Sequence, residues 1–125
     1  MKIKQAIVKV YFFCLITLLS FAGANAQLKV TAALCEHKIN PYGVAVTNMH
    51  FSWELDAKER AQVQTAYQLV IASSASNLAS GQYDVWNSTV VKSATSQLVK
   101  YTGKKLQPAQ IYYWRVKVWD KNNQP

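Results

Sequence analysis

Cysteine, glycine, proline and acidic residues are all scarce in this chain. Its 125 residues include two Cys, four Gly, three Pro and six Asp or Glu. Cys14 lies in the first 26 residues, so only Cys35 remains beyond them, and that part of the chain cannot form an internal disulfide. The few glycines form no phosphate-binding loop, and no serine lies in a nucleophile-elbow motif. The fold must therefore rest on its apolar core, and no cofactor is expected.

The shortage of acidic residues also bears on catalysis. Glu54, Asp56 and Glu59 are close in sequence, but Glu54 falls on the polar side of a predicted strand and the other two in a charged loop. Ionised surface carboxylates are therefore expected, because nothing in the sequence indicates a cleft that would raise a pKa. His37 and His50 have no thiolate cluster near them, so no metal site is predicted. We expect no catalytic residue here.

The single cysteine beyond the first 26 residues is open to two interpretations. A lone thiol can act as a nucleophile, but His37 is the only basic group close to Cys35 in sequence. Its place after Leu34, in an apolar stretch, favours a small buried filler of a strand.

Residues 1–26 have the pattern of a cleavable secretory signal. Three lysines precede an apolar run at 10–23, and small residues follow up to Ala26. The run is shorter than the roughly 20 residues that span a bilayer. We expect cleavage after Ala26, a secreted or periplasmic protein, and no membrane attachment afterwards. Lipid anchoring through Cys14 is a minor alternative, because bulky aromatic residues precede it.

The charge balance argues against a nucleic-acid partner. Removing the three lysines of 1–26 leaves 11 basic and six acidic residues, a net charge of +5. The basic residues are spread along the chain, whereas nucleic-acid sites gather them on one face. Residues 27–125 have the length of one domain.

Hydrophobic periodicity predicts an all-β fold. The clearest strand is 112–119, where alternation places Tyr112 and Trp114 on the core side, with Trp53 and Tyr67 from earlier strands. The remaining expectations are strands at 28–36, 49–55, 65–73 and 96–101, one helical turn at 74–81, and short edge pieces at 83–86 and 90–91.

The opposite side of strand 112–119 is the one candidate interaction face. It carries Tyr113, Arg115, Lys117 and Trp119, which suit either contact with another domain or stacking on a sugar ring. Because exposed aromatic patches usually mark contact surfaces, docking is the preferred interpretation.

Two resemblances give this pattern a family. Leu106, Pro108 and Tyr112 are spaced as in the corner of fibronectin type III domains, where a tyrosine hydroxyl binds the backbone. Five segments in order also resemble the N-terminal module of bacterial α-L-rhamnosidases of glycoside hydrolase family 78. They are LCEHKINPYGV (34–44), FSWEL (51–55), QTAYQLVIASS (64–74), VWNSTVVKS (85–93) and YYWRVKVWD (112–120).

The resemblance implies a fibronectin type III or immunoglobulin-like β-sandwich at 27–125 that lacks its last strand, as in a truncated fragment. It further implies an accessory module of a secreted enzyme that removes terminal rhamnose from glycosides by inversion. The catalytic barrel of that family lies downstream, and its carboxylates have no counterparts here. The expected partners are downstream domains of the parent enzyme and, less favoured, rhamnose-containing glycans. The alternative is an independent fibronectin type III module that binds carbohydrate or protein.

Overall fold

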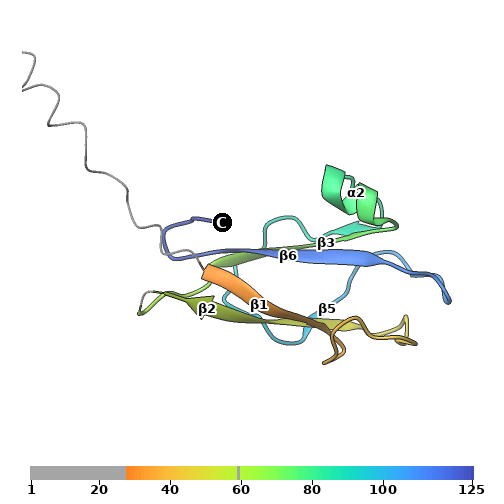
Figure 1. The fold of residues 1–125 in the computed structure, drawn as a ribbon, viewed down its shortest axis with the longest axis horizontal. Helices are drawn as coiled ribbons and strands as arrows, with labels where there is room; N and C mark the ends of the chain where they lie inside the picture. The colour runs from red at the N-terminus through yellow and green to blue at the C-terminus, as the bar shows by residue number, and fades with distance from the viewer. Residues whose placement is uncertain (1–27, 59) are drawn as a thin grey trace, which may run out of the picture.

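The chain folds into two antiparallel β-sheets packed face to face, as Figure 1 shows. The structure is a computed structural model, and it describes residues 28–58 and 60–125. The predicted signal segment 1–26 therefore lies outside the described residues. The strands are β1 (Leu28–Cys35), β2 (His50–Ala57), β3 (Ala66–Ala72), β4 (Trp86–Asn87), β5 (Val99–Lys100) and β6 (Tyr113–Trp119), with helix α2 (Ala75–Ser80) after β3.

Each sheet has three strands, ordered β1-β2-β5 and β4-β3-β6. Strands β1 and β2 pair along their whole length, with one irregularity between Val30 and Ala32. In the second sheet β6 pairs with β3, and no strand of 28–58 or 60–125 lies on its other side. The predicted all-β sandwich is confirmed, with β6 as an edge strand.

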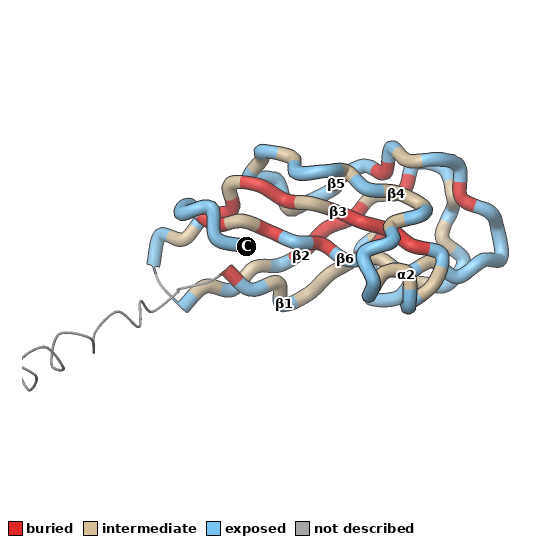
Figure 2. Tube along the Cα trace, turned by 90° about the horizontal axis from the view of Figure 1, so that it is seen from above, coloured by how far each residue is buried: buried red, intermediate tan, exposed pale blue. Residues whose placement is uncertain are grey.

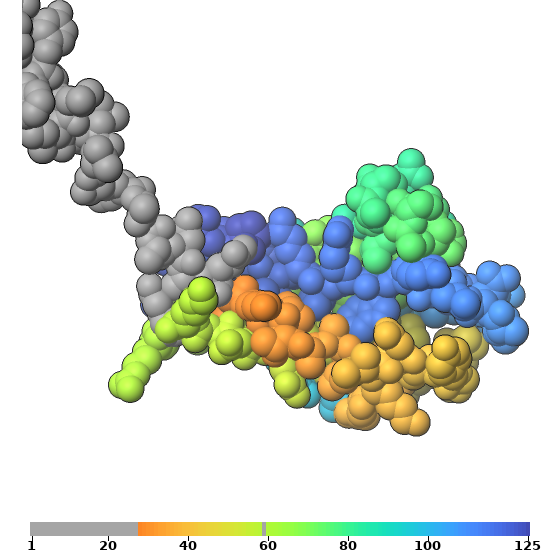
Figure 3. Space-filling view, viewed as in Figure 1, coloured from red at the N-terminus to blue at the C-terminus, as the bar shows by residue number. Residues whose placement is uncertain are grey.

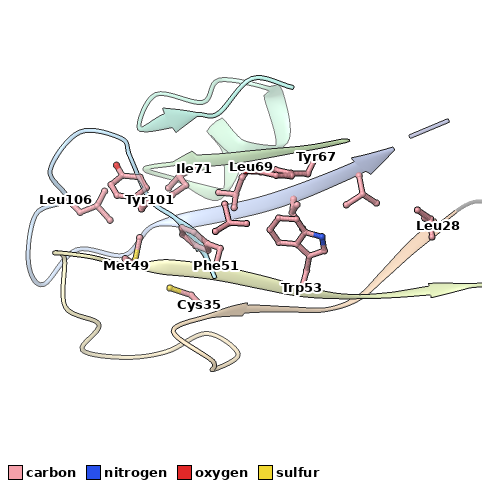
Figure 4. Close-up of a cluster of buried hydrophobic side chains, with 13 residues drawn as sticks. Leu28, Cys35, Met49, Phe51, Trp53, Tyr67, Leu69, Ile71, Tyr101 and Leu106 are labelled. Atoms are coloured by element: carbon pink, nitrogen blue, oxygen red, sulfur yellow. The ribbon is translucent and has the colours of Figure 1, made fainter. Parts of the chain in front are cut away.

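Alternating side chains of β2 and β3 form the core between the sheets. Phe51 and Trp53 from β2 face Leu69 and Ile71 from β3 (Figure 4), and all four are at most 1 % exposed. Burying side chains of this size contributes roughly 1.5–3 kcal/mol each.

The four aromatic side chains predicted for the interior are found there. The ring of Trp53 meets that of Tyr67 with centroids 5.1 Å apart, and Trp114 meets Phe51 at 4.6 Å. Trp53 and Tyr67 are buried, whereas Tyr112 and Trp114 are half-buried and pack against the core. The prediction from period-two alternation is confirmed.

Strand β3 is buried on both faces, which its sequence of near-continuous apolar residues allows. Val70 and Ala72 point away from the core but are 3 % and 0 % exposed. Helix α2 lies over this outer side (Figure 1), and Figure 2 shows the buried run along β3. The helix begins where the Ser74 hydroxyl accepts a hydrogen bond from the Asn77 amide and ends at Gly81, with φ of 79°. The predicted turn at 74–81 is confirmed.

The structure corrects one local expectation. The predicted strand 96–101 is reduced to Val99–Lys100, because Leu98 has a φ of 53°, outside strand geometry. The polar Ser52 of β2 is only 4 % exposed. The irregular segment before β5 covers it: the Leu98 amide donates to the Ser52 hydroxyl at 3.0 Å, and the Trp53 amide donates to the Ser96 carbonyl at 2.8 Å.

The predicted tyrosine corner is present. The Gln107 amide donates to the Tyr112 hydroxyl at 2.9 Å. This bond connects the loop before β6 to Tyr112, the residue immediately before the strand. This bond sets the path by which the chain enters β6.

Replacing Tyr112 by Phe should lower the free energy of unfolding by about 1 kcal/mol, because one hydrogen bond is lost and the ring remains. Thermal unfolding would show this as a midpoint lower by roughly 4–8 °C. The matched control is Tyr113→Phe, since Tyr113 is 39 % exposed and should lose nothing. Equal midpoints for the two variants would show that the corner does not stabilise the fold.

A buried glutamine joins the core to an irregular segment. Gln64 is 5 % exposed; its Oε1 accepts from the Trp53 indole nitrogen at 2.8 Å. Its Nε2 donates to the carbonyls of Ser93 and Thr95 at 3.0 and 2.9 Å. One side chain thus provides partners for the buried indole and for two backbone groups of the strandless segment that follows β4.

Replacing Gln64 by Leu should lower the free energy of unfolding by about 2–3 kcal/mol, because it leaves buried polar groups without partners. Gln68→Leu is the control, since Gln68 bonds only the exposed Asn87 side chain. Urea unfolding monitored by tryptophan fluorescence would measure both. A loss for Gln64→Leu no larger than for Gln68→Leu would contradict this role.

Candidate functional site

The predicted interaction face lies on the outer side of the β4-β3-β6 sheet. Tyr113, Arg115 and Lys117 are exposed and Trp119 is half-buried, all on the side of β6 turned away from the core. Strand pairing brings Gln68 of β3 beside Lys117, and Val70 beside Arg115. The four residues that the alternation pattern grouped therefore lie on one side of β6. The outward side chains of the adjacent strand β3 lie beside them.

Each of the two cations on this face contacts an aromatic residue. The Arg115 guanidinium donates to the Tyr83 hydroxyl at 3.0 Å, across the buried Val70 of β3. The Lys117 ammonium lies 5.1 Å from the ring centre of Trp119, within cation–π range. A sugar that stacked on this ring face would have to displace Lys117. The two cations of this face therefore lie at the surface, and Lys117 lies over the ring of Trp119.

Sequence reasoning missed three members of this face: Tyr83, Gln68 and Asn87. The Gln68 amide donates to the Asn87 side-chain oxygen at 2.9 Å, so two polar side chains of β3 and β4 are joined on this side of the sheet. Tyr83 was assigned only to an edge piece, because nothing in its local pattern shows that it reaches Arg115. Its contact depends on β4 and β6 lying on the two sides of β3.

A groove of about 380 Å³ opens between β4 and β5, on one side of the sandwich. Its walls combine apolar side chains with hydroxyl and amide groups, and Lys100 is its only charged residue. Such a groove holds no acid–base pair. Its lining residues are Tyr67, Trp86, Asn87, Ser88, Val91, Ser93, Thr95, Val99, Lys100 and Thr102.

The carboxylates considered above lie away from this groove. Glu54 and Asp56 are exposed on the outer side of β2, and Glu59 lies outside the described residues. Inverting hydrolysis requires one carboxylic acid and one carboxylate flanking the scissile bond. Neither Glu54 nor Asp56 lines the groove. Among residues 28–58 and 60–125, no three His, Cys, Asp or Glu side chains gather as a metal site would require.

The turn after β1 contains the other titratable groups of interest. The Glu36 carboxylate accepts from the His50 amide at 2.5 Å and lies 3.3 Å from its Nδ1, and the amide contact chiefly lowers the pKa of Glu36. His37 is exposed. Burial, helped by the Glu36 charge, raises the pKa of the Cys35 thiol to about 11. A thiol protonated at neutral pH and buried at 6 % exposure behaves as core filler, as predicted.

No helix in the part of the chain that the structure describes is long and apolar enough to cross a membrane.

Comparison with known proteins assigns this sandwich to a family. A sequence profile described as "Rha78A-like, N-terminal immunoglobulin domain" matches residues 30–125. The chain belongs to this family. The Rha78A-like domain is 45 % identical over 100 residues to an α-L-rhamnosidase of Formosa agariphila, a match covering 80 % of this chain and 10 % of that protein. It is 39 % identical over 95 residues to one of Streptomyces avermitilis, covering 76 % of this chain and 9 % of the relative.

Solved structures agree with this assignment. The α-L-rhamnosidase of Dictyoglumus thermophilum matches with a TM-score of 0.70 and 40 % identity, over 74 % of this chain and 10 % of that one. The Streptomyces avermitilis enzyme, solved with L-rhamnose, gives 0.74 and 37 %, over 78 % and 9 %. The Rha78A-like domain thus spans about a tenth of the proteins it resembles.

Proposed function

We propose that this chain is the accessory N-terminal module of a secreted α-L-rhamnosidase, and that it braces neighbouring domains without contacting the scissile bond. The observation that carries the proposal is the match over residues 30–125 to a family of N-terminal immunoglobulin domains, with a match that covers only 10 % of a relative named as an α-L-rhamnosidase. Export is inferred from the signal pattern at 1–26. The outer face of β6 is the proposed contact with a neighbouring domain.

The arrangement of charged groups supports a non-catalytic role. The 380 Å³ groove is lined by no carboxylate, and the exposed Glu54 and Asp56 of β2 are not among its lining residues. The pairing of Lys117 with Trp119 leaves the cation available to an acidic partner surface more readily than the ring to a sugar. Docking is therefore favoured over a carbohydrate-binding role for the same face.

The chain alone should not hydrolyse an aryl α-L-rhamnoside, whereas the polypeptide encoded by the complete gene should. The reason is that inverting hydrolysis needs a pair of carboxyl groups with room for water between them. Release of the coloured aglycone measures both. Hydrolysis by the chain alone, or an intact gene product without rhamnosidase activity, would overturn the proposal.

Affinity electrophoresis tests the sugar-binding alternative. The chain should migrate equally with and without rhamnose-containing glycans in the gel, because Lys117 occupies the ring of Trp119. The control is Trp119→Ala, which should migrate the same way. Retardation of the wild-type chain that disappears in Trp119→Ala would show that this face binds glycan.

A further inference from the structure

Exposed apolar side chains gather at one end of the sandwich. The loop between β1 and β2 carries Ile39 and Tyr42, which are 69 % and 100 % exposed. The segment leading into β6 carries Ile111 and Tyr113, which are 71 % and 39 % exposed. Both segments lie at the end opposite the C-terminal turn (Figure 1), and their atoms form one end of the surface in Figure 3. We call residues 36–48 and 104–113 together the distal end.

This concentration is unlike the rest of the described surface. Single exposed apolar residues are ordinary, but several in adjacent segments mark a contact surface. The three other exposed large apolar side chains lie elsewhere: Val63 is in the loop between β2 and β3, and Val90 and Leu98 flank the groove side. The distal end also contains both of the most exposed ones, Tyr42 and Ile111.

The two segments are held in place by specific bonds. Cys35 and Lys38 exchange backbone hydrogen bonds of 3.0 Å in both directions, closing the turn after β1. The Glu36 carboxylate accepts from the His50 amide, and the Gln107 amide donates to the Tyr112 hydroxyl. Apolar side chains on segments already tied to the strands lose less conformational entropy when a partner covers them.

The charges of the distal end select the partner. It carries three lysines, at 38, 104 and 105, and a single carboxylate, Glu36, which already contacts His50. The Lys104 ammonium donates to the Asp84 carbonyl at 2.7 Å, so Lys38 and Lys105 are the two lysines of this end whose ammonium groups make no such contact within residues 28–58 and 60–125. A second copy of this surface would place lysines against lysines, which disfavours self-association. A surface with an apolar centre and a rim of Asp and Glu is complementary to it.

We infer that the distal end docks on an apolar, acid-rimmed surface of another domain of the same rhamnosidase polypeptide. The inference rests on the proposed function, because about nine-tenths of each α-L-rhamnosidase relative lies outside the part that this chain matches. It adds a second contact at one end of the sandwich, next to the outer face of β6, with Tyr113 belonging to both surfaces. Two contacts on different sides would hold the module in one orientation.

Hydrogen exchange in the chain alone and in the complete enzyme tests this docking. Amides of 36–48 and 107–113 should exchange at least about tenfold more slowly in the complete enzyme, because a covered surface opens less often. The segment at 60–65, at the other end of the sandwich, is the internal control and should exchange equally in both.

The double variant Tyr42→Ser with Ile111→Ser should abolish this protection in the complete enzyme. Both side chains are exposed, so the thermal midpoint of the chain alone should not change. Val63→Ser is the matched control, because Val63 is also exposed, at 54 %, but lies outside the distal end. It should leave the protection intact.

The possible outcomes distinguish a failure of the docking inference from a failure of the proposed function. An active rhamnosidase in which 36–48 and 107–113 exchange as in the chain alone overturns the docking inference and leaves the proposed function standing. Sedimentation of the chain as a dimer that Tyr42→Ser with Ile111→Ser dissociates would assign the surface to a second copy and also overturn it. A complete gene product without rhamnosidase activity overturns both.

Discussion

The hydrogen bond between the Trp53 indole and Gln64 is the constraint on which the two-sheet arrangement depends. Trp53 is fully buried between the sheets, so its one polar atom needs a partner inside the protein. Gln64 provides it and, through its amide, also holds the carbonyls of Ser93 and Thr95. The segment that would otherwise be a loose connection between β4 and β5 is thereby fixed against the core. Cys35 is the only cysteine in residues 28–58 and 60–125, so these hydrogen bonds, and no disulfide within that part of the chain, hold the segment.

From this core the interaction surfaces follow. Because the alternate side chains of β6 point away from the core, Arg115 and Lys117 lie on the outer side of the sheet, where they contact Tyr83 and Trp119. The last residues of β1 and the first residues of β6 lie at the same end of the sandwich, where the adjoining loops expose apolar side chains. A module with rigid contact surfaces and no paired carboxylates in its groove is suited to holding other domains in place, which is the role we propose for it.

The sequence predicted which residues share the candidate face, but it did not predict which residues they contact. Alternation alone placed Tyr113, Arg115, Lys117 and Trp119 on one side of a strand, because side-chain direction in a strand depends only on parity. The partner of Arg115 could not be predicted, since Tyr83 reaches it across β3. The distal end was missed because turn residues such as Pro41 and Gly43 mark a loop without showing which other loop lies beside it. An isoleucine and a tyrosine next to those turn residues were the available signal.

By itself the sequence determined the strands with strong local patterns, the short helix after β3 and the tyrosine corner, because each depends on residues within a few positions of one another. The tertiary structure decided where distant segments meet. It shortened the predicted strand 96–101, since Leu98 of that segment is bonded to Ser52 and Ser96 to the Trp53 amide. It also crowds Gly103, where a Cβ would lie 2.5 Å from the Tyr101 hydroxyl and 2.7 Å from Trp86, so that a larger residue would force these side chains to shift. Such requirements come from packing between residues far apart in the chain, which local periodicity does not record.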